Sequence, residues 1–192
     1  MAEKQYEEIN GYSLATSTEY HFEVNKEIEC PEQFEEMIGC LRQSGPNDTI
    51  YIHLNSPGGC LETTIQVIGA MRNSQATVVT CAEGSVASGA AIIFFAGHMM
   101  TLVPHCEFLI HTARGGMGGK LPDQLSTVAS LERRLLTLYD DVFGGFLTKR
   151  ELGQVKNGRE LFLTSEDVEQ RLQEYMARMQ QDAEEQETEL ED

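Results

Sequence analysis

Basic residues are scarce in this sequence. Lys and Arg number 14 against 31 Asp and Glu, which gives a formal net charge of −17 at pH 7. A nucleic-acid-binding groove needs clustered Lys and Arg to displace counterions from phosphates, so we expect no nucleic-acid partner. Seven acidic residues and no basic residue stand in the last 13 positions, 180–192, which predicts a disordered acidic tail.

Long apolar runs are also missing. No stretch of 18 or more apolar residues occurs, so we expect no transmembrane helix and no membrane partner. The first ten residues, MAEKQYEEIN, are acidic and lack the apolar segment of a secretory signal, which favours a cytoplasmic protein. Residues 1–18 are polar and weakly patterned, and we interpret them as a mobile arm.

Cysteines number five, an odd count, and none of them has the CxxC spacing of a zinc knuckle. We therefore expect reduced thiols that serve as small core side chains. His98, His105 and Cys106 are near one another in the sequence, but their spacing is not that of a metal site. The sequence predicts no metal and no cofactor.

Strand-like and helix-like segments alternate along residues 19–179, which indicates one α/β domain of repeated β-α units. A chain of 192 residues can form one such domain with a sizeable core. The expected strands are 19–29, 50–54, 76–83, 99–104, 106–111 and 160–164, and the expected helices are 31–45, 60–74, 85–97, 121–147 and 166–180, the last with Ser165 as its N-cap.

The expected helix at 121–147 is apolar on more than one side. Such a helix must be buried on more than one side, and a second subunit is the simplest source of cover. We therefore expect a homo-oligomer. The main stripe is Leu121, Leu125, Val128, Leu135, Val142 and Phe146, and it is widened by Leu131, Leu136, Leu138, Tyr139 and Phe143.

The turn Ser56-Pro57-Gly58-Gly59 separates an expected buried strand from an expected helix. Its two glycines let the backbone approach a ligand closely and leave N–H groups free where the helix begins. These N–H groups are suited to bind developing negative charge, which is the chemistry of an oxyanion hole. The same four residues also make an ordinary turn between a strand and a helix.

Two further positions carry reactive side chains. Ser88 is flanked by small residues near the start of an apolar helix, and His111 ends the strand-like CEFLIH just before a glycine-rich bend. The serine could act as a nucleophile and the histidine as a base facing a cleft. Each also fits a purely structural role, since small residues permit tight helix packing and a histidine can end a buried strand.

Together the three motifs are far more specific than each alone. SPGG, then SVASGA about thirty residues later, then LIH about twenty residues further, resemble the proteolytic subunit of the Clp (caseinolytic) protease family, a family of serine peptidases. The resemblance runs from about Ile50 to Ala177. It implies an α/β fold of the Clp/crotonase type, with a protruding handle of β-strand and long helix at about 112–147.

The resemblance also implies roles for individual residues. Ser88 would be the nucleophile, His111 the general base, and Gly59 and Gly89 the oxyanion N–H donors. The family usually has methionine after the nucleophile, where this sequence has Gly89.

The acid of the triad precedes a short strand in the family. That position holds Glu160 here in place of the usual aspartate. A glutamate has the charge to hold the imidazole tautomer and to stabilise imidazolium, so Glu160 is the predicted orienting acid. Asp140, Asp141 and Asp167 are alternatives for that role.

The resulting hypothesis is a serine endopeptidase that hydrolyses unfolded polypeptides or short peptides inside an oligomeric chamber, a heptameric ring or double ring. An ATP-driven unfoldase is the further partner implied by the resemblance, although the N-terminal regions that shape its docking site are short and diverged here. One alternative is a catalytically impaired ring subunit or scaffold that assembles with an active paralogue. Another is acyl-coenzyme A chemistry on the related crotonase fold.

Overall fold

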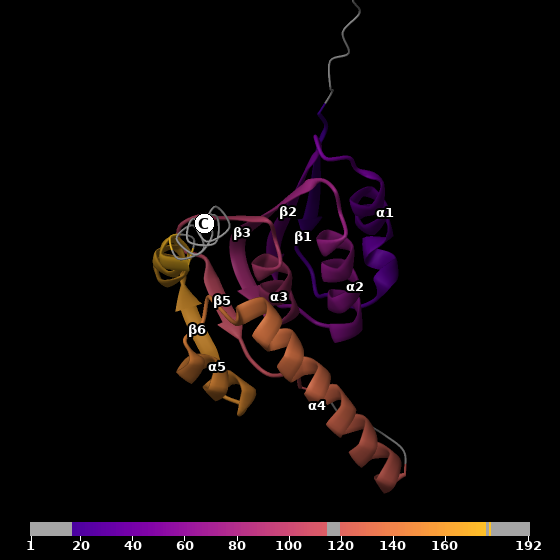
Figure 1. Ribbon diagram of the computed structural model, residues 1–192, viewed down its shortest axis with the longest axis vertical. Coiled ribbons are helices and arrows are strands. Elements are labelled where there is room, and N and C mark those ends of the chain that lie inside the picture. The colour runs from indigo at the N-terminus through magenta and orange to yellow at the C-terminus, as the bar shows by residue number, and fades with distance from the viewer. Residues whose placement is uncertain (1–16, 115–119, 176, 178–192) are drawn as a thin grey trace, which may run out of the picture.

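A computed structural model describes residues 17–114, 120–175 and 177, so the expected N-terminal arm, the glycine-rich bend at 115–119 and the acidic tail lie almost wholly outside the described residues. The described chain is an α/β fold around a six-stranded sheet (Figure 1). The strands are β1 (Glu19–Val24), β2 (Thr49–Ser56), β3 (Thr77–Ala87), β4 (Met99–Leu102), β5 (Glu107–Ile110) and β6 (Leu161–Thr164).

The sheet is parallel except at one edge. Its order is β1-β2-β3-β5-β6, and β4 also pairs with β3. Only the β5–β6 pair is antiparallel. The helices are the 3-10 helix η1 (Pro31–Phe34), α1 (Glu35–Gln43), α2 (Leu61–Arg72), α3 (Gly89–Phe95), α4 (Leu121–Phe143) and α5 (Lys149–Lys156). A further helix, the C-terminal helix, begins at residue 165 and is described through residue 175. None of the described helices is both long and apolar enough to cross a membrane.

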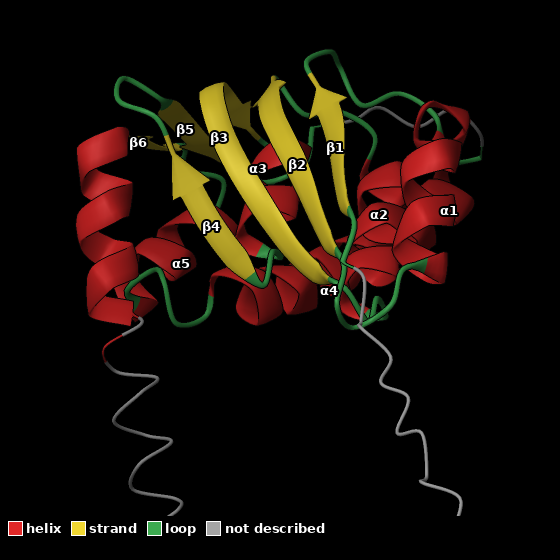
Figure 2. Ribbon diagram, turned by 90° about the horizontal axis from the view of Figure 1, so that it is seen from above, coloured by secondary structure: helices red, strands yellow, loops and turns green. Residues whose placement is uncertain are grey.

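The core lies between the sheet and the helices that cover one of its faces (Figure 2). Strand β2 shows why the sequence folds this way, because its apolar residues alternate with polar ones and point to the covered face. Ile50, Ile52 and Leu54 are fully buried there. The opposite side of β2 carries Tyr51 and His53, and the His53 ring pairs with Glu83 at 2.7 Å.

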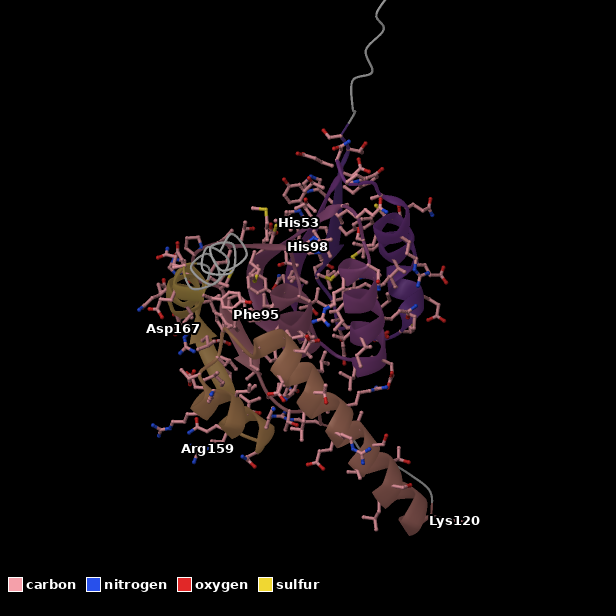
Figure 3. All side chains as sticks on the ribbon, viewed as in Figure 1. His53, Phe95, His98, Lys120, Arg159 and Asp167 are labelled. Atoms are coloured by element: carbon pink, nitrogen blue, oxygen red, sulfur yellow. The ribbon has the colours of Figure 1, made fainter. Side chains whose placement is uncertain are left out.

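An aromatic cluster joins the sheet layer to the C-terminal helices. Phe95, at the end of α3, lies centrally between these parts (Figure 3). Its ring centroid is 5.6 Å from that of Phe143 and 4.3 Å from that of Phe146. This contact anchors one end of α4 to the body of the domain.

Helix α4 projects away from that anchor (Figure 1). At 23 residues it is about 35 Å long, and Lys120 marks its far end (Figure 3). Its C-terminal half is buried through Leu135, Leu138, Tyr139, Val142 and Phe143, whereas Leu125 and Val128 in the other half are 65% and 50% exposed. A single copy of the chain therefore covers only part of the predicted apolar stripe.

The expected end of the third strand at residue 83 is wrong, because β3 continues through Gly84 to Ala87. The Asn55 side chain allows this continuation by accepting a hydrogen bond from the Ser85 N–H at 3.1 Å. A Cβ at Gly84 would lie only 2.5 Å from the same Asn55 oxygen, so glycine serves close packing here. The helix that was expected from residue 85 consequently starts at Gly89.

Several other boundaries differ from expectation. The first strand stops at Val24, and the long helix ends at Phe143 instead of near residue 147. The C-terminal helix is capped by Thr164, whose Oγ1 accepts a hydrogen bond from the Asp167 N–H at 3.2 Å. Ser165, the predicted cap, instead accepts a hydrogen bond from the His105 N–H at 3.0 Å.

Candidate active site

Ser88 occupies a sharp turn between β3 and α3. Its backbone has φ 55° and ψ −119°, a conformation that non-glycine residues rarely adopt. Two hydrogen bonds hold the turn, because the Ser88 N–H donates to the Leu109 carbonyl at 2.8 Å and the Ser88 carbonyl accepts from the Ile92 N–H at 3.2 Å. The serine is half-buried and lines the neighbouring cleft.

The SPGG turn packs directly against Ser88. Gly58 has φ 84°, and a Cβ on it would lie 2.6 Å from the Gly89 nitrogen and 2.8 Å from the Ser88 Cβ. Only a residue without a side chain allows the two turns to come this close.

A backbone bridge to Ile28 holds the SPGG turn in place. The Ile28 N–H donates to the Gly58 carbonyl at 2.8 Å, and the Cys60 N–H donates to the Ile28 carbonyl at 2.6 Å. Within the described part of the chain, the N–H groups of Gly59 and Gly89 donate no hydrogen bond. Two free amides therefore lie beside the serine.

His111 follows β5 and is fixed through its backbone. Its carbonyl accepts a hydrogen bond at 2.7 Å from the hydroxyl of Tyr139 on α4. Its Nδ1 lies 2.6 Å from the Thr112 carbonyl oxygen. A carbonyl only accepts hydrogen bonds, so Nδ1 carries a hydrogen, and in the neutral form of such a ring Nε2 is the unprotonated nitrogen. This is the tautomer that a general base requires.

One cleft of about 780 Å³ joins these groups, since Gly59, Ser88, Gly89 and His111 all line it. Apolar side chains of α3 and α4 form part of its wall. Among the described residues no hydrogen bond links the Ser88 hydroxyl to the imidazole of His111. Catalytic hydrogen bonds are often long in empty enzymes and shorten when substrate binds.

Glu160 is not brought to this cleft. Its carboxylate forms an ion pair with Arg114, and no hydrogen bond joins it to His111 in the described residues. The Thr112 carbonyl takes the position at Nδ1 that a triad acid would hold. The alternative carboxylates are engaged elsewhere: Asp140 pairs with Lys156, Asp141 pairs with Arg72, and Asp167 takes part in the Thr164 cap.

Tyr139 is a site residue that the sequence reasoning treated only as part of the apolar stripe. Its side chain is buried, which raises the pKa of its hydroxyl to about 12. A buried tyrosine hydroxyl needs a hydrogen-bond partner, so a tyrosine within an apolar stripe was the signal in the sequence for a polar contact at this position. The sequence reasoning also missed Thr64. Its Oγ1 would lie 2.6 Å from a Cβ on Gly89, so Thr64 leaves no room for a side chain at residue 89.

All five cysteines are free thiols, as the sequence predicts. The prediction that they serve as core side chains is wrong for Cys30, which is exposed, and for Cys40 and Cys60, which are half-buried. Cys81 and Cys106 are buried, and burial raises the pKa of each. Cys60 is half-buried and lines the cleft, where hydrogen bonds from Thr63 lower the pKa of its thiol. Across the described residues, no three His, Cys, Asp or Glu side chains are arranged to hold a metal ion.

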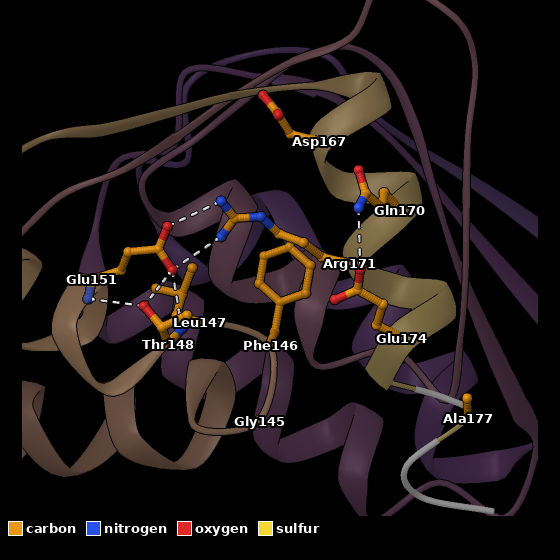
Figure 4. A pocket seen from close by; sticks show the side chains of 10 residues that line it. All are labelled: Gly145, Phe146, Leu147, Thr148, Glu151, Asp167, Gln170, Arg171, Glu174 and Ala177. Carbon is orange, nitrogen blue, oxygen red and sulfur yellow. Dashed lines mark hydrogen bonds and ion pairs between the residues drawn. The ribbon is translucent and has the colours of Figure 1, made fainter.

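A second hollow lies between α5 and the C-terminal helix (Figure 4). Arg171 crosses it with two hydrogen bonds to the Glu151 carboxylate, at 3.0 and 3.1 Å. Burial alone would raise the pKa of Glu151, but hydrogen bonds from Arg171 and Thr148 outweigh it and lower the pKa. This hollow shares no lining residue with the Ser88 cleft, and its contacts join two helices.

The six-stranded α/β fold and the serine cleft are consistent with one family of known proteins. Residues 19–171 match the family described as Clp protease, and the chain belongs to that family. It is 32% identical over 101 residues to an ATP-dependent Clp protease proteolytic subunit of Ostreococcus tauri, with 50% of each chain covered. It is 30% identical over 114 residues to a protein of the same name from Chlorella vulgaris, with 57% of each chain covered.

A third relative is matched over a longer segment. The ATP-dependent Clp protease proteolytic subunit 1 of Gloeobacter violaceus is 27% identical over 135 residues, which cover 68% of this chain and 67% of that protein. The chain thus spans about half to two thirds of the length of these curated relatives. The low identities describe a divergent member of the family.

Proposed function

We propose that this chain is a serine endopeptidase that hydrolyses unfolded polypeptides or short peptides inside an oligomeric chamber. The observation that carries the proposal is the shared cleft, which brings a strained Ser88, two free backbone amides and the imidazole of His111 to one place. Membership of the Clp protease family supports the same reaction.

The chemistry follows from the positions of these groups. His111 Nε2 accepts the proton of the Ser88 hydroxyl while Oγ attacks the scissile carbonyl carbon. The N–H groups of Gly59 and Gly89 stabilise the oxyanion that forms. His111 then gives its proton to the leaving amine, and an acyl-enzyme remains on Ser88. Water, deprotonated by the same histidine, releases the acid product and restores the serine.

Glu160 is our proposed orienting acid, although it now pairs with Arg114. The Arg114 side chain is 75% exposed, and exposed ion pairs of this kind stabilise by only about 0–1 kcal/mol. The pair can therefore open at small cost and release the carboxylate. Glu160→Gln should lower kcat/KM by about 10²–10⁴-fold if the carboxylate orients His111, with Asp140→Asn as a control of equal charge change. An unchanged kcat/KM would show that the Thr112 carbonyl alone holds His111 in the tautomer with its hydrogen on Nδ1.

The exposed apolar residues of helix α4 are the argument for assembly into rings. Leu125 and Val128 leave an apolar surface on its projecting half, and a second copy of the chain is the proposed cover. By analogy with the family we propose a heptameric ring or double ring in the cytoplasm. The relatives are named ATP-dependent proteins, which supports an ATP-driven unfoldase as a further partner.

Hydrolysis of a fluorogenic peptide tests the peptidase proposal. Ser88→Ala should lose at least about 10³-fold in kcat/KM, because the nucleophile is gone. Ser85→Ala is the matched control, since Ser85 lies in the same segment, is exposed and is held through its backbone N–H. Equal activity of wild type and Ser88→Ala would reject the proposal.

A catalytically impaired ring subunit is the second candidate. The observation in its favour is that, in the described residues, His111 makes no hydrogen bond with Ser88 or with a carboxylate. An impaired subunit should show no turnover alone and should co-purify with a second, similar subunit that supplies the activity. Full turnover by the isolated chain would exclude this candidate.

A further inference from the structure

Two glutamates stand together on one side of the Ser88 cleft. Glu27 and Glu29 both line the cleft and are both exposed. They flank Ile28, which is buried and holds the SPGG turn through its backbone. Side chains alternate in direction along an extended segment, so the two carboxylates project to the same side, opposite to Ile28. The backbone bridge thus holds the segment 27–29 beside the SPGG turn at the rim of the cleft.

The other charges of the cleft are balanced. Glu62 forms an ion pair with Arg134, and Arg114 forms one with Glu160. Glu27 and Glu29 make no ion pair with any residue in the described ranges.

The nearest basic residue in the sequence, Lys26, does not line the cleft. The unbalanced charge on this side of the site is therefore negative.

Apolar side chains line the cleft as well, namely Ile92 of α3 and Leu131 and Leu135 of α4. A peptide that lies across Ser88 consequently meets both an apolar surface and two carboxylates.

We propose that Glu27 and Glu29 determine substrate specificity, an inference that rests on the proposed peptidase function. The cleft selects peptides that have an apolar side chain towards α4 and a Lys or Arg side chain towards the two glutamates. Exposed charge pairs are individually weak, so two of them give a preference of about 5–30-fold for Lys over Glu at the matching substrate position. The preference should shrink as salt screens the charges.

Internally quenched peptides test this specificity. Each peptide carries Lys, Gln or Glu at one position within three residues of the scissile bond and is otherwise constant. For wild type, kcat/KM should favour Lys over Glu by about 5–30-fold at one or more positions. Glu27→Gln combined with Glu29→Gln should reduce the ratio to about 1–2. These substitutions leave the backbone bridge of Ile28 intact.

The control is Glu19→Gln combined with Glu23→Gln. These two glutamates are exposed on β1, lie outside the cleft and change the net charge by the same amount. The control should keep the wild-type Lys-to-Glu ratio. If it lowers the ratio as strongly as the cleft variant, overall charge sets the preference and the inference is overturned.

Failure of this inference is distinguishable from failure of the peptidase proposal. Cleavage of the Gln peptide with a Lys-to-Glu ratio near 1 in wild type would overturn the specificity and leave the peptidase intact. If no peptide is cleaved, binding of labelled Lys and Glu peptides to full-length Ser88→Ala protein, measured by fluorescence anisotropy, decides the matter. Equal dissociation constants for the two peptides would overturn the inference there as well.

Discussion

Replacing Ser88 with glycine should stabilise the fold while it removes the proposed nucleophile. Ser88 has a φ of 55°, which is unfavourable for any residue with a Cβ. Glycine adopts this region freely, whereas alanine keeps the Cβ and the strain. The informative comparison is therefore between Ser88→Gly and Ser88→Ala, because both lack the hydroxyl.

Two opposing effects set the difference in the free energy of unfolding between these variants. A residue held in a sparsely populated backbone region costs about 1–3 kcal/mol. Glycine also lowers the free energy of unfolding by about 0.5–1 kcal/mol, because it makes the unfolded chain more flexible. Ser88→Gly should thus be more stable than Ser88→Ala by about 1 kcal/mol, or about 2–4 °C in Tm for a chain of this size.

Urea unfolding followed by circular dichroism measures the difference. Both variants are compared at one protein concentration, because assembly stabilises the folded state by mass action. Ser88→Gly should have the higher midpoint at equal slope. A glycine variant less stable than the alanine variant would show that the Ser88 backbone is not strained, and the account of the turn would fail.

Three further predictions concern Gly89, Tyr139 and the projecting half of α4. Gly89→Ala should cost about 1–3 kcal/mol in urea unfolding, because its Cβ would lie 2.6 Å from the Thr64 hydroxyl oxygen; Thr64→Ala should recover part of that loss, and strict additivity of the two changes would contradict the contact. Burial raises the pKa of Tyr139 to about 12, so the folded chain keeps a proton that the unfolded chain loses near pH 10. Stability should therefore fall as pH rises from about 10 to 12, by at most about 1.4 kcal/mol per unit, and Tyr139→Phe should lessen the fall in urea midpoints; parallel curves would refute this. Leu125→Asp with Val128→Asp should yield smaller particles in sedimentation velocity with unchanged circular dichroism, and an unchanged particle mass would exclude α4 from the subunit contact.

Much of the fold was predictable because its signals are local. The alternation in Ile50, Ile52 and Leu54 predicts a strand with one buried face, and the structure confirms it. The order of β-α units and the α/β class follow from similar patterns. The prediction that Ser88 and His111 face one cleft needed the family resemblance as well, since each residue alone fitted a structural role.

The failures arise where a distant group decides a local structure. Strand β3 extends past Gly84 because the amide of Asn55, some thirty residues earlier, takes a backbone bond. Thr164 caps the last helix in place of its neighbour Ser165, since Ser165 binds the backbone of His105 sixty residues away. No periodicity or propensity along the sequence reports such contacts.

The position of Glu160 shows the same limit. Its place before a short strand suggested an orienting acid, but its partner is decided by where Arg114 lies after the chain leaves β5. Two side chains 46 residues apart in sequence meet only in the folded chain. The acid therefore stays a prediction, whereas the Ser88 cleft is a feature of the structure.

Transfer of the Ser88 proton to His111 is tested most directly by the rate and site of reaction with a fluorophosphonate. Peptide mass mapping should find the adduct on Ser88, and His111→Ala should slow labelling by about 10²–10⁴-fold. An adduct on another residue, or a rate that His111→Ala leaves unchanged, would contradict the pairing of these two side chains.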